Sequence, residues 1–350
     1  MPPRLRRVSC SAPGLGRVRR GKGFSYVDLG GRPVKDEATL ARIAALVIPP
    51  AWNDVWICPV ASGHLQATGV DVKGRRQYRY HDQWRVQQDL AKHERILDFA
   101  ARLPAARERM REDLRSEGLT RRRVLACAVR LIDLAFFRIG GEQYAEENES
   151  YGLATIRKEH VRVRAGQLDF DFSGKSGKDW QRTLAEPEVL AVVQALKRRR
   201  DGGQELLAYR GDKGRWVDVR SADINAYLRD VTGGEDTAKD FRTWSATVLA
   251  AVGLAVSVEV AQSPTARKRA VSRVVREVAD YLGNTPAVCR ASYIDPRLFD
   301  LFEAGTTIAA DIDRLGVDAV YGEPAVQGEF EAAVLGLLRD APEPALRSTG

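Results

Sequence analysis

Apolar residues recur every three or four positions over most of the chain after about residue 85, which is the pattern of amphipathic helices. The clearest case is 121–138, where an apolar stripe runs from Leu125 to Phe136 and Gly140 follows, so that Arg138 falls in the last helical turn. Further helices are predicted over the ranges 36–46, 84–102, 105–117, 187–200, 221–231, 242–256, 264–282, 297–303, 306–314 and 325–339.

Two stretches alternate apolar and polar residues instead, as half-buried strands do. Residues 54–80 predict an antiparallel sheet, with strands at 55–58, 64–68 and 75–80 and a further short strand at 24–27. Residues 160–183 predict a three-stranded β-hairpin sheet with a glycine-rich tip. We therefore expect an α+β fold, in which a small N-terminal antiparallel β-sheet domain (1–85) precedes a larger, mainly helical domain (86–350) that carries the three-stranded sheet.

The charge of the chain limits what it binds. Its 350 residues carry a formal net charge of +8, and the excess of positive residues lies before residue 300. From Asp300 on, ten acidic residues accompany three arginines. A basic surface needs an acidic partner, for which nucleic acid and a membrane surface are the candidates. The chain has no signal peptide and no apolar run of the roughly 20 residues that span a membrane, so we expect a soluble intracellular protein.

The strand at 75–80 is the first candidate for binding nucleic acid. Its sequence, RRQYRY, places Arg76, Tyr78 and Tyr80 on one face and Arg75, Gln77 and Arg79 on the other. Arginines on such a strand hold phosphates, while tyrosines stack on bases or bond to them. A half-exposed strand with solubilising arginines is the alternative. The neighbouring Lys73 and the basic N-terminus favour DNA.

The glycine-rich tip at 174–178, GKSGK, resembles a phosphate-binding loop only superficially. A Walker A loop needs the spacing GxxxxGK[ST] between a strand and a helix, whereas this tip lies between two strands. We therefore expect no nucleotide. Lys175, or Lys178 beside it, could instead reach from the hairpin into a groove and give up a proton.

Two arginines lie at predicted helix boundaries, Arg138 and Arg242. Each alone is typical of a surface or ion-paired arginine. If the two converged, their guanidinium groups would hold the non-bridging oxygens of a phosphodiester. The four histidines and four cysteines show no metal-ligand spacing, and no carboxylate cluster suits Mg²⁺, so we expect no metal and no cofactor.

The stretch 280–296, DYLGNTPAVCRASYIDP, ends one helix and begins another. Gly283 stops the long helix, and Thr285 followed by Pro286 supplies a cap and a first-turn proline for a short helix that presents Tyr293. By itself Tyr293 could be an ordinary half-buried aromatic residue. It gains significance only if Arg138, Lys175 and Arg242 converge on it.

In order along the chain, these motifs resemble the type IB DNA topoisomerases, specifically the small poxvirus-like form found in bacteria. The resemblance extends from about Arg17 to about Phe299. The segments that carry it are VIPPAWNDVWICP (47–59), GHLQATGVDVKGRRQYRYHDQW (63–84), FFRIGGEQYAEENESYGLATIRKEHV (136–161), FSGKSGK (172–178), KDFRTW (239–244) and LGNTPAVCRASYIDP (282–296).

The resemblance implies a catalytic role for five residues. Tyr293 matches the nucleophile that forms a 3′-phosphotyrosine, and Arg138 and Arg242 match the arginines that stabilise the pentavalent phosphorane. Lys175 matches the hairpin lysine that protonates the leaving 5′-oxygen. Asn284 stands where many members carry a histidine that donates to a non-bridging oxygen, and an amide can also donate there but cannot carry charge.

The resemblance also implies that Gln77, Tyr78 and Tyr80 make major-groove contacts, and that a monomer closes as a clamp around double-stranded DNA. It further implies relaxation of supercoils without ATP or metal, by a cytoplasmic enzyme associated with the nucleoid. A tyrosine recombinase is one alternative, but such enzymes typically place a histidine where this chain has Lys239. A non-catalytic DNA-binding protein is the other, and it would need no matched tyrosine, lysine and arginines.

Overall fold

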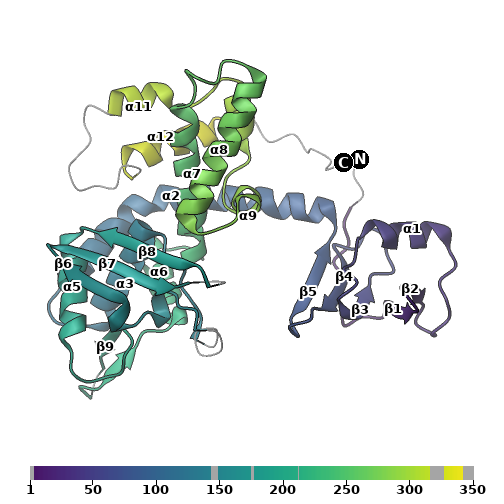
Figure 1. The fold of residues 1–350 in the computed structure, drawn as a ribbon, viewed down its shortest axis with the longest axis horizontal. Helices are drawn as coiled ribbons and strands as arrows, with labels where there is room; N and C mark the ends of the chain where they lie inside the picture. The colour runs from purple at the N-terminus through teal and green to yellow at the C-terminus, as the bar shows by residue number, and fades with distance from the viewer. Residues whose placement is uncertain (1–3, 143–148, 175–176, 212, 316–326, 342–350) are drawn as a thin grey trace. The chain divides into compact units, whose positions relative to one another are not determined.

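The computed structural model of the chain describes residues 4–142, 149–174, 177–211, 213–315 and 327–341 (Figure 1). The described residues form two compact units, one up to Lys92 and one from His93 on. Helix α2 (Asp82–Arg115) crosses this division. Both sheets of the predicted α+β fold are present, and the remainder is mostly helical, so the predicted fold class is confirmed.

The first unit is built on a five-stranded antiparallel sheet in the order β2-β1-β3-β4-β5. Its elements are β1 (Leu15–Arg20), β2 (Gly23–Val27), α1 (Glu37–Ala45), β3 (Asn53–Ile57), β4 (Leu65–Val70) and β5 (Arg76–Tyr80). A small core of Ile43, Val55, Ile57 and Ala67 joins α1 to the sheet. Burial of these apolar side chains supplies the main driving force for the packing.

Strand β1 was not expected from the apolar pattern, because its sequence LGRVRR has few apolar residues. It forms because Gly21, at φ +54, allows a tight turn that pairs Arg20 with Gly23. Arg17 then donates to the carbonyls of Pro49 and Trp52, and its guanidinium lies 4.1 Å from the centre of the Phe24 ring. An arginine can therefore hold a strand in place as an apolar residue would.

The second unit packs around α3 (Arg121–Ala135), whose residues 124–135 are all buried. Helices α5 (Pro187–Arg198), α6 (Ser221–Thr232) and α7 (Ala238–Ala255) contact it. The three-stranded antiparallel sheet, in the order β6-β7-β8, comprises Val161–Arg164, Gln167–Ser173 and Asp179–Leu184. The remaining elements are η1 (Leu153–Thr155), η2 (Lys158–His160), the two-stranded sheet of β9 (Ala208–Arg210) and β10 (Trp216–Asp218), α8 (Pro264–Leu282), α9 (Pro286–Ser292), α10 (Arg297–Glu303), α11 (Ala309–Leu315) and α12 (Glu329–Arg339). None of the described helices is both long and apolar enough to cross a membrane.

Several predicted helix boundaries are wrong. Helix α7 begins at Ala238 rather than at residue 242, so Arg242 lies inside the helix and not at its start. The ranges 84–102 and 105–117 form the single helix α2, with Pro104 inside it. Proline removes only one backbone donor, and Leu103 and Ala106 on either side of it are buried, so packing outweighs the lost hydrogen bond. Helix α3 ends at Ala135 rather than at residue 138, because Phe136 adopts a left-handed conformation at φ 57°. Arg138 therefore lies beyond the helix and not in its last turn.

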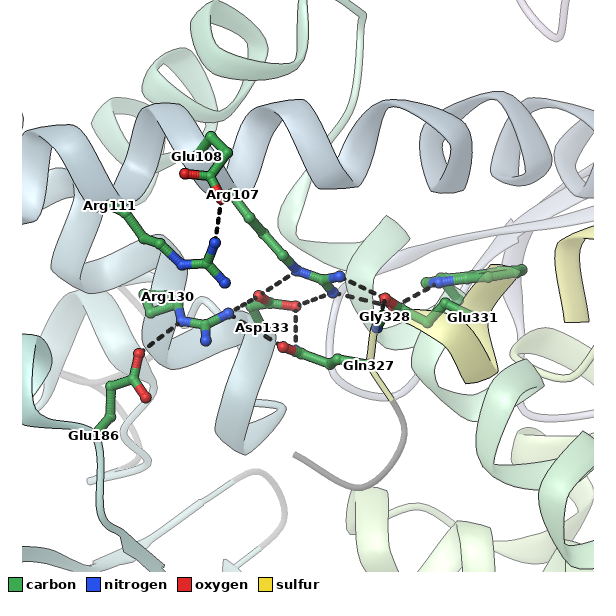
Figure 2. Close-up of polar contacts among 10 residues, drawn as sticks. Arg107, Glu108, Arg111, Arg130, Asp133, Glu186, Gln327, Gly328 and Glu331 are labelled. Atoms are coloured by element: carbon green, nitrogen blue, oxygen red, sulfur yellow. Dashed lines mark hydrogen bonds and ion pairs between the residues drawn. The ribbon is translucent and has the colours of Figure 1, made fainter. Parts of the chain in front are cut away.

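A buried polar cluster ties four helices of the second unit together (Figure 2). Arg107 of α2 donates to both carboxylate oxygens of Asp133 of α3, at 2.9 and 2.8 Å. Its other side donates to Glu331 of α12, which also accepts from the indole N–H of Trp244 of α7 at 2.9 Å. Arg130 completes the cluster by donating to Asp133 and to Glu186. Each arginine here is paired with carboxylates.

We predict that Asp133→Asn lowers the free energy of unfolding by about 3 to 5 kcal/mol, because it leaves two buried guanidiniums without their shared carboxylate. Urea titration at neutral pH measures this loss. The matched control is Glu108→Gln, because Glu108 pairs with Arg111 at the surface and its side chain is 64% exposed. That variant should lose less than about 1 kcal/mol. Equal losses in the two variants would contradict the prediction.

The pairing of Asp133 with two arginines also predicts how the stability of the protein depends on pH. Burial opposes ionisation of Asp133, but Arg107 and then Arg130 outweigh it and hold the pKa of Asp133 below its usual value. The stabilisation is therefore present above the unfolded-state pKa of about 4 and is lost as the pH falls through the lower folded-state pKa. The unfolding free energy of Asp133→Asn should consequently fall less steeply in acid than that of the unsubstituted protein.

Candidate active site

The end of α8 supplies the frame of the site. Gly283 adopts the left-handed conformation, at φ 63°, and the N–H of Asn284 then bonds back to the carbonyl of Ala279 at 2.8 Å. This cap turns the chain and leaves the carbonyls of Leu282 and Gly283 free of helical partners. Thr285 caps the short helix α9, with Pro286 in its first turn, as the sequence predicted.

The two predicted arginines meet at these carbonyls. Arg242, from the second turn of α7, donates to Leu282 at 2.8 Å and also to the carbonyl of Phe136. Arg138 donates to Gly283 at 2.9 Å and to the side-chain oxygen of Asn284. Because the C-terminal carbonyls of a helix carry partial negative charge, they are suitable ligands for two cations.

The segment that carries Arg138 is fixed through its backbone. The carbonyls of Arg138 and Ile139 accept the N–H groups of Leu153 and Ala154 at 2.9 and 2.8 Å. Gly152 approaches Gly140 so closely that a Cβ on it would lie 2.3 Å from the Gly140 Cα. The glycines therefore permit the contact that sets the position of Arg138.

Tyr293 lies beside this pair. It follows the last residue of α9, with its N–H on the carbonyl of Cys289 at 3.0 Å. The guanidinium carbon of Arg242 is 5.5 Å from the centre of the Tyr293 ring. The structure thus places Arg138, Arg242, Asn284 and Tyr293 together. Lys175, the fifth predicted residue, lies outside the described residues.

The electrostatics of the pair differ from those of the cluster in Figure 2. Within the described ranges, neither Arg138 nor Arg242 has a carboxylate at ion-pair distance, and Arg242 is only 3% exposed. Burial lowers the pKa of Arg138. Burial and then the charge of Arg138 lower the pKa of Arg242 to about 10, although Tyr293 opposes that shift. Both groups stay protonated at neutral pH, so the site carries positive charge that an anion would neutralise.

A cavity of about 180 Å³ opens beside Arg138 and Asn284. Its lining includes Lys178, Trp180 and Arg182 from the β7–β8 hairpin and its second strand. The side-chain nitrogen of Asn284 is buried and has no hydrogen-bond partner in the described part of the chain. Since arginine only donates, the Asn284 oxygen must face Arg138, which leaves its N–H groups available. Sequence reasoning had not identified Trp180 and Arg182.

The predicted DNA-contact residues lie in the first unit, on β5 and the turn before it. Tyr78 and Tyr80 are 47% and 40% exposed, and their rings stack with centroids 6.0 Å apart. Arg76 is exposed on the same face, as alternation predicts, and Lys73 is exposed in the turn. Arg75 and Gln77 both donate to Asp71, at 2.8 to 2.9 Å.

Asp71 was missed because a turn aspartate carries no distinctive sequence signal. Hydrogen bonds from Arg75 lower the pKa of Asp71 to about 2. The carboxylate is therefore ionised at neutral pH and fixes the orientation of both the Arg75 guanidinium and the Gln77 amide. Within the described ranges, no three His, Cys, Asp or Glu side chains gather in a way that could hold a metal ion.

Two family models match the chain. The model described as eukaryotic DNA topoisomerase I, catalytic core, matches residues 81–305, and that of the bacterial DNA topoisomerase IB N-terminal domain matches residues 23–71. DNA topoisomerase 1B of Acanthamoeba polyphaga mimivirus is 29% identical over 83% of this chain and 88% of its own length. DNA topoisomerase 1B of vaccinia virus (strain Copenhagen) is 22% identical over 77% of this chain and 84% of its own. The XerH site-specific recombinase, solved bound to a palindromic difH substrate, is 16% identical to this chain and covers 57% of this chain and 50% of its own. Its TM-score of 0.35 is too low to bear on fold or function.

We predict that Gly283→Ala destabilises the protein more than Gly233→Ala. Both glycines are left-handed helix caps, at φ 63° and 69°, so each substitution should cost about 1 to 2 kcal/mol for the backbone alone. A Cβ on Gly233 meets nothing within 4 Å, whereas a Cβ on Gly283 would lie 2.7 Å from the Trp180 ring. That overlap should add a further 1 to 3 kcal/mol or so. Urea unfolding of the two variants measures these losses of stability. Equal losses would show that overlap with the Trp180 ring adds no cost.

Proposed function

The chain belongs to the type IB DNA topoisomerases, and we propose that it relaxes supercoils through a transient covalent bond between Tyr293 and one strand of duplex DNA. The observation that carries the mechanism is the pair of guanidiniums beside Tyr293, which lack a carboxylate among the described residues. A DNA phosphodiester is the anion that would neutralise them. Carbonyl ligands orient both side chains without occupying all of their N–H groups.

In the proposed cleavage step, the phenolic oxygen of Tyr293 attacks the phosphorus of the scissile phosphodiester. A bond forms between tyrosine oxygen and phosphorus, and the bond from phosphorus to the 5′-oxygen breaks. The phenol proton leaves to solvent, and the departing 5′-oxygen takes up a proton from the protein. The products are a 3′-phosphotyrosine and a free 5′-hydroxyl.

Arg138 and Arg242 would stabilise the negative charge that grows on the non-bridging oxygens during this step. Such stabilisation by preorganised donors is usually the largest single contribution to catalysis. Asn284 would add a donor, because Arg138 holds its oxygen and leaves its nitrogen without a partner in the described residues. An amide supplies a hydrogen bond but no charge, so this contribution is smaller than that of a cation.

A lysine from the β7–β8 hairpin would protonate the leaving oxygen. Lys175 is the residue at the family position, and Lys178 lines the cavity beside Arg138 and Asn284. An ammonium group within reach of the leaving oxygen could serve as the general acid. The phosphotyrosyl bond retains the energy of the broken diester, so religation needs no ATP.

Binding would be divided between the two units. In the first, Lys73, Arg76, Tyr78 and Tyr80 offer exposed cationic and aromatic groups, while Asp71 orients Arg75 and Gln77. In the second, the arginine pair holds the scissile phosphate. We propose that the units close on the duplex as a monomeric clamp. We also propose that the enzyme is associated with the nucleoid in the cytoplasm, where its substrate is chromosomal DNA. Much of the affinity would come from phosphate contacts and would fall steeply with salt.

The decisive test is relaxation of supercoiled plasmid in EDTA and without ATP. We expect steady relaxation of both supercoil signs, and no covalent adduct from Tyr293→Phe, because only the nucleophilic oxygen is removed. Binding of Tyr293→Phe to a short duplex should stay within about twofold, since the phosphate contacts remain. SDS trapping and fluorescence anisotropy measure the two properties. An adduct with Tyr293→Phe would show that another residue is the nucleophile, and a folded protein without relaxation would contradict the proposal.

The identity of the general acid has its own test. We expect Lys175→Ala to slow cleavage of ordinary DNA by 10²- to 10⁴-fold or so, the usual contribution of a general acid. A substrate with sulfur at the leaving 5′ position should restore most of that rate, because a thiolate leaves without a proton. Lys178→Ala is the matched control from the same hairpin. Rescue of Lys178→Ala and not of Lys175→Ala would assign the acid to Lys178.

A further inference from the structure

One buried hydroxyl connects the helix of Arg242 to the chain that follows Tyr293. Thr247 lies on α7, five residues after Arg242, and is 1% exposed. Its oxygen accepts the backbone N–H of Asp295 at 3.1 Å. It also lies 3.3 Å from the carbonyl of Tyr293 and 3.0 Å from that of Thr243. Because a hydroxyl has a single proton, it donates to these two carbonyls in alternation while it accepts from Asp295.

The chain at Tyr293 needs such a support, because it has left regular structure. Tyr293 has φ −124° and ψ −34°, outside the helical range, and its N–H and that of Ile294 both bond to the carbonyl of Cys289. The next backbone groups, the Tyr293 carbonyl and the Asp295 N–H, bond to Thr247. One side chain therefore fixes the peptide groups on both sides of Ile294, which is itself buried.

The far side of this connection is also fixed. The Asp295 carboxylate accepts from the Arg297 guanidinium, with its closest contact at 2.7 Å, and Arg297 also donates to Glu94 at 2.7 Å. The segment is thus held from Asp295 on by charge, and between Tyr293 and Asp295 by Thr247. Loss of the hydroxyl would release the part that lies nearest to the phenol.

We propose that Thr247 is a positioning residue that holds the Tyr293 phenol in register with the Arg242 guanidinium, an inference that rests on the proposed cleavage chemistry. Arg242 and Thr247 both lie on α7, so the arginine and the residue that supports Tyr293 move as one rigid body. Five residues of helix separate them by about 7.5 Å along the axis. Catalysis by oriented groups is sensitive to such geometry, and an error of about 1 Å can cost 10²-fold in rate.

The test uses Thr247→Val, which keeps the shape of the side chain and removes the hydroxyl, and Thr247→Ser, which keeps the hydroxyl. Single-turnover formation of the covalent adduct on a short duplex should slow by about 10- to 100-fold in Thr247→Val and by less than about threefold in Thr247→Ser. Affinity for a duplex with a non-cleavable linkage at the scissile position should stay within about twofold for both variants. This separation of rate from binding is the signature of a positioning role.

Thr243→Val is the matched control. Thr243 is also buried on α7, at 1% exposure, but among the described residues its hydroxyl bonds only within the helix, to the carbonyl of Lys239 at 3.1 Å. Its variant should cleave DNA within about threefold of the unsubstituted rate at a similar unfolding midpoint in urea. The inference is overturned if Thr247→Val cleaves normally, or if Thr247→Ser or Thr243→Val is slowed as much as Thr247→Val.

The proposed function and this inference fail in different ways. If the unsubstituted protein forms no adduct through Tyr293, the proposed function itself is wrong. If it forms the adduct and Thr247→Val forms it equally fast, only the role of Thr247 is wrong.

Discussion

The candidate active site depends on the burial of two like charges at the end of one helix. Arg138 and Arg242 repel each other, and burial lowers the pKa of both. Carboxylates would relieve that repulsion, but they would also compete with a phosphate. The carbonyls at the C-terminus of α8 reduce the repulsion by less, because they carry only partial charge. They accept hydrogen bonds without neutralising the arginines. The left-handed turn at Gly283 exposes them, so the turn and the arginine pair depend on each other.

Other buried arginines of the same unit are paired with carboxylates instead of carbonyls. Arg107 and Arg130 bond to Asp133, Glu186 and Glu331, and these contacts join α2, α3, α7 and α12. A paired charge fixes helices and has little attraction left for a ligand. The residue that links the two regions is Trp244, which bonds to Glu331 from the same helix that carries Arg242. Helix α12 thereby contributes to the framework that holds Arg242.

Local signals predicted the fold class and the backbone frame of the candidate site. The alternation of RRQYRY predicted which of its side chains share a face, and the sequence Gly-Asn-Thr-Pro predicted both the end of α8 and the start of α9. These signals succeed because a cap or an alternating strand is specified by neighbours in the sequence. Motif resemblance supplied the convergence of Arg138, Arg242, Asn284 and Tyr293, which no local pattern contains.

The features that escaped prediction depend on contacts between distant residues. Pro104 stays inside a helix because the side chains around it are buried, and Thr247 matters only because the chain returns 46 residues later. Phe136 is the sharpest case. A left-handed phenylalanine costs about 1 to 2 kcal/mol relative to a helical one, and no sequence pattern would place it there. Burial of its ring and an edge contact with Tyr281 offset that cost.

The strained conformation of Phe136 has a role that a glycine could not fill as well. It ends α3 three residues before the predicted limit and turns the Phe136 carbonyl to Arg242. The chain then runs on so that Arg138, two residues later, donates to the carbonyl of Gly283 at the end of α8. A glycine would adopt the same angles without strain, but it would lose the buried ring that holds the turn in one conformation. Phe136 and Gly283 therefore both help to align the arginine pair through left-handed turns, and of these two only Gly283 could be found from the sequence.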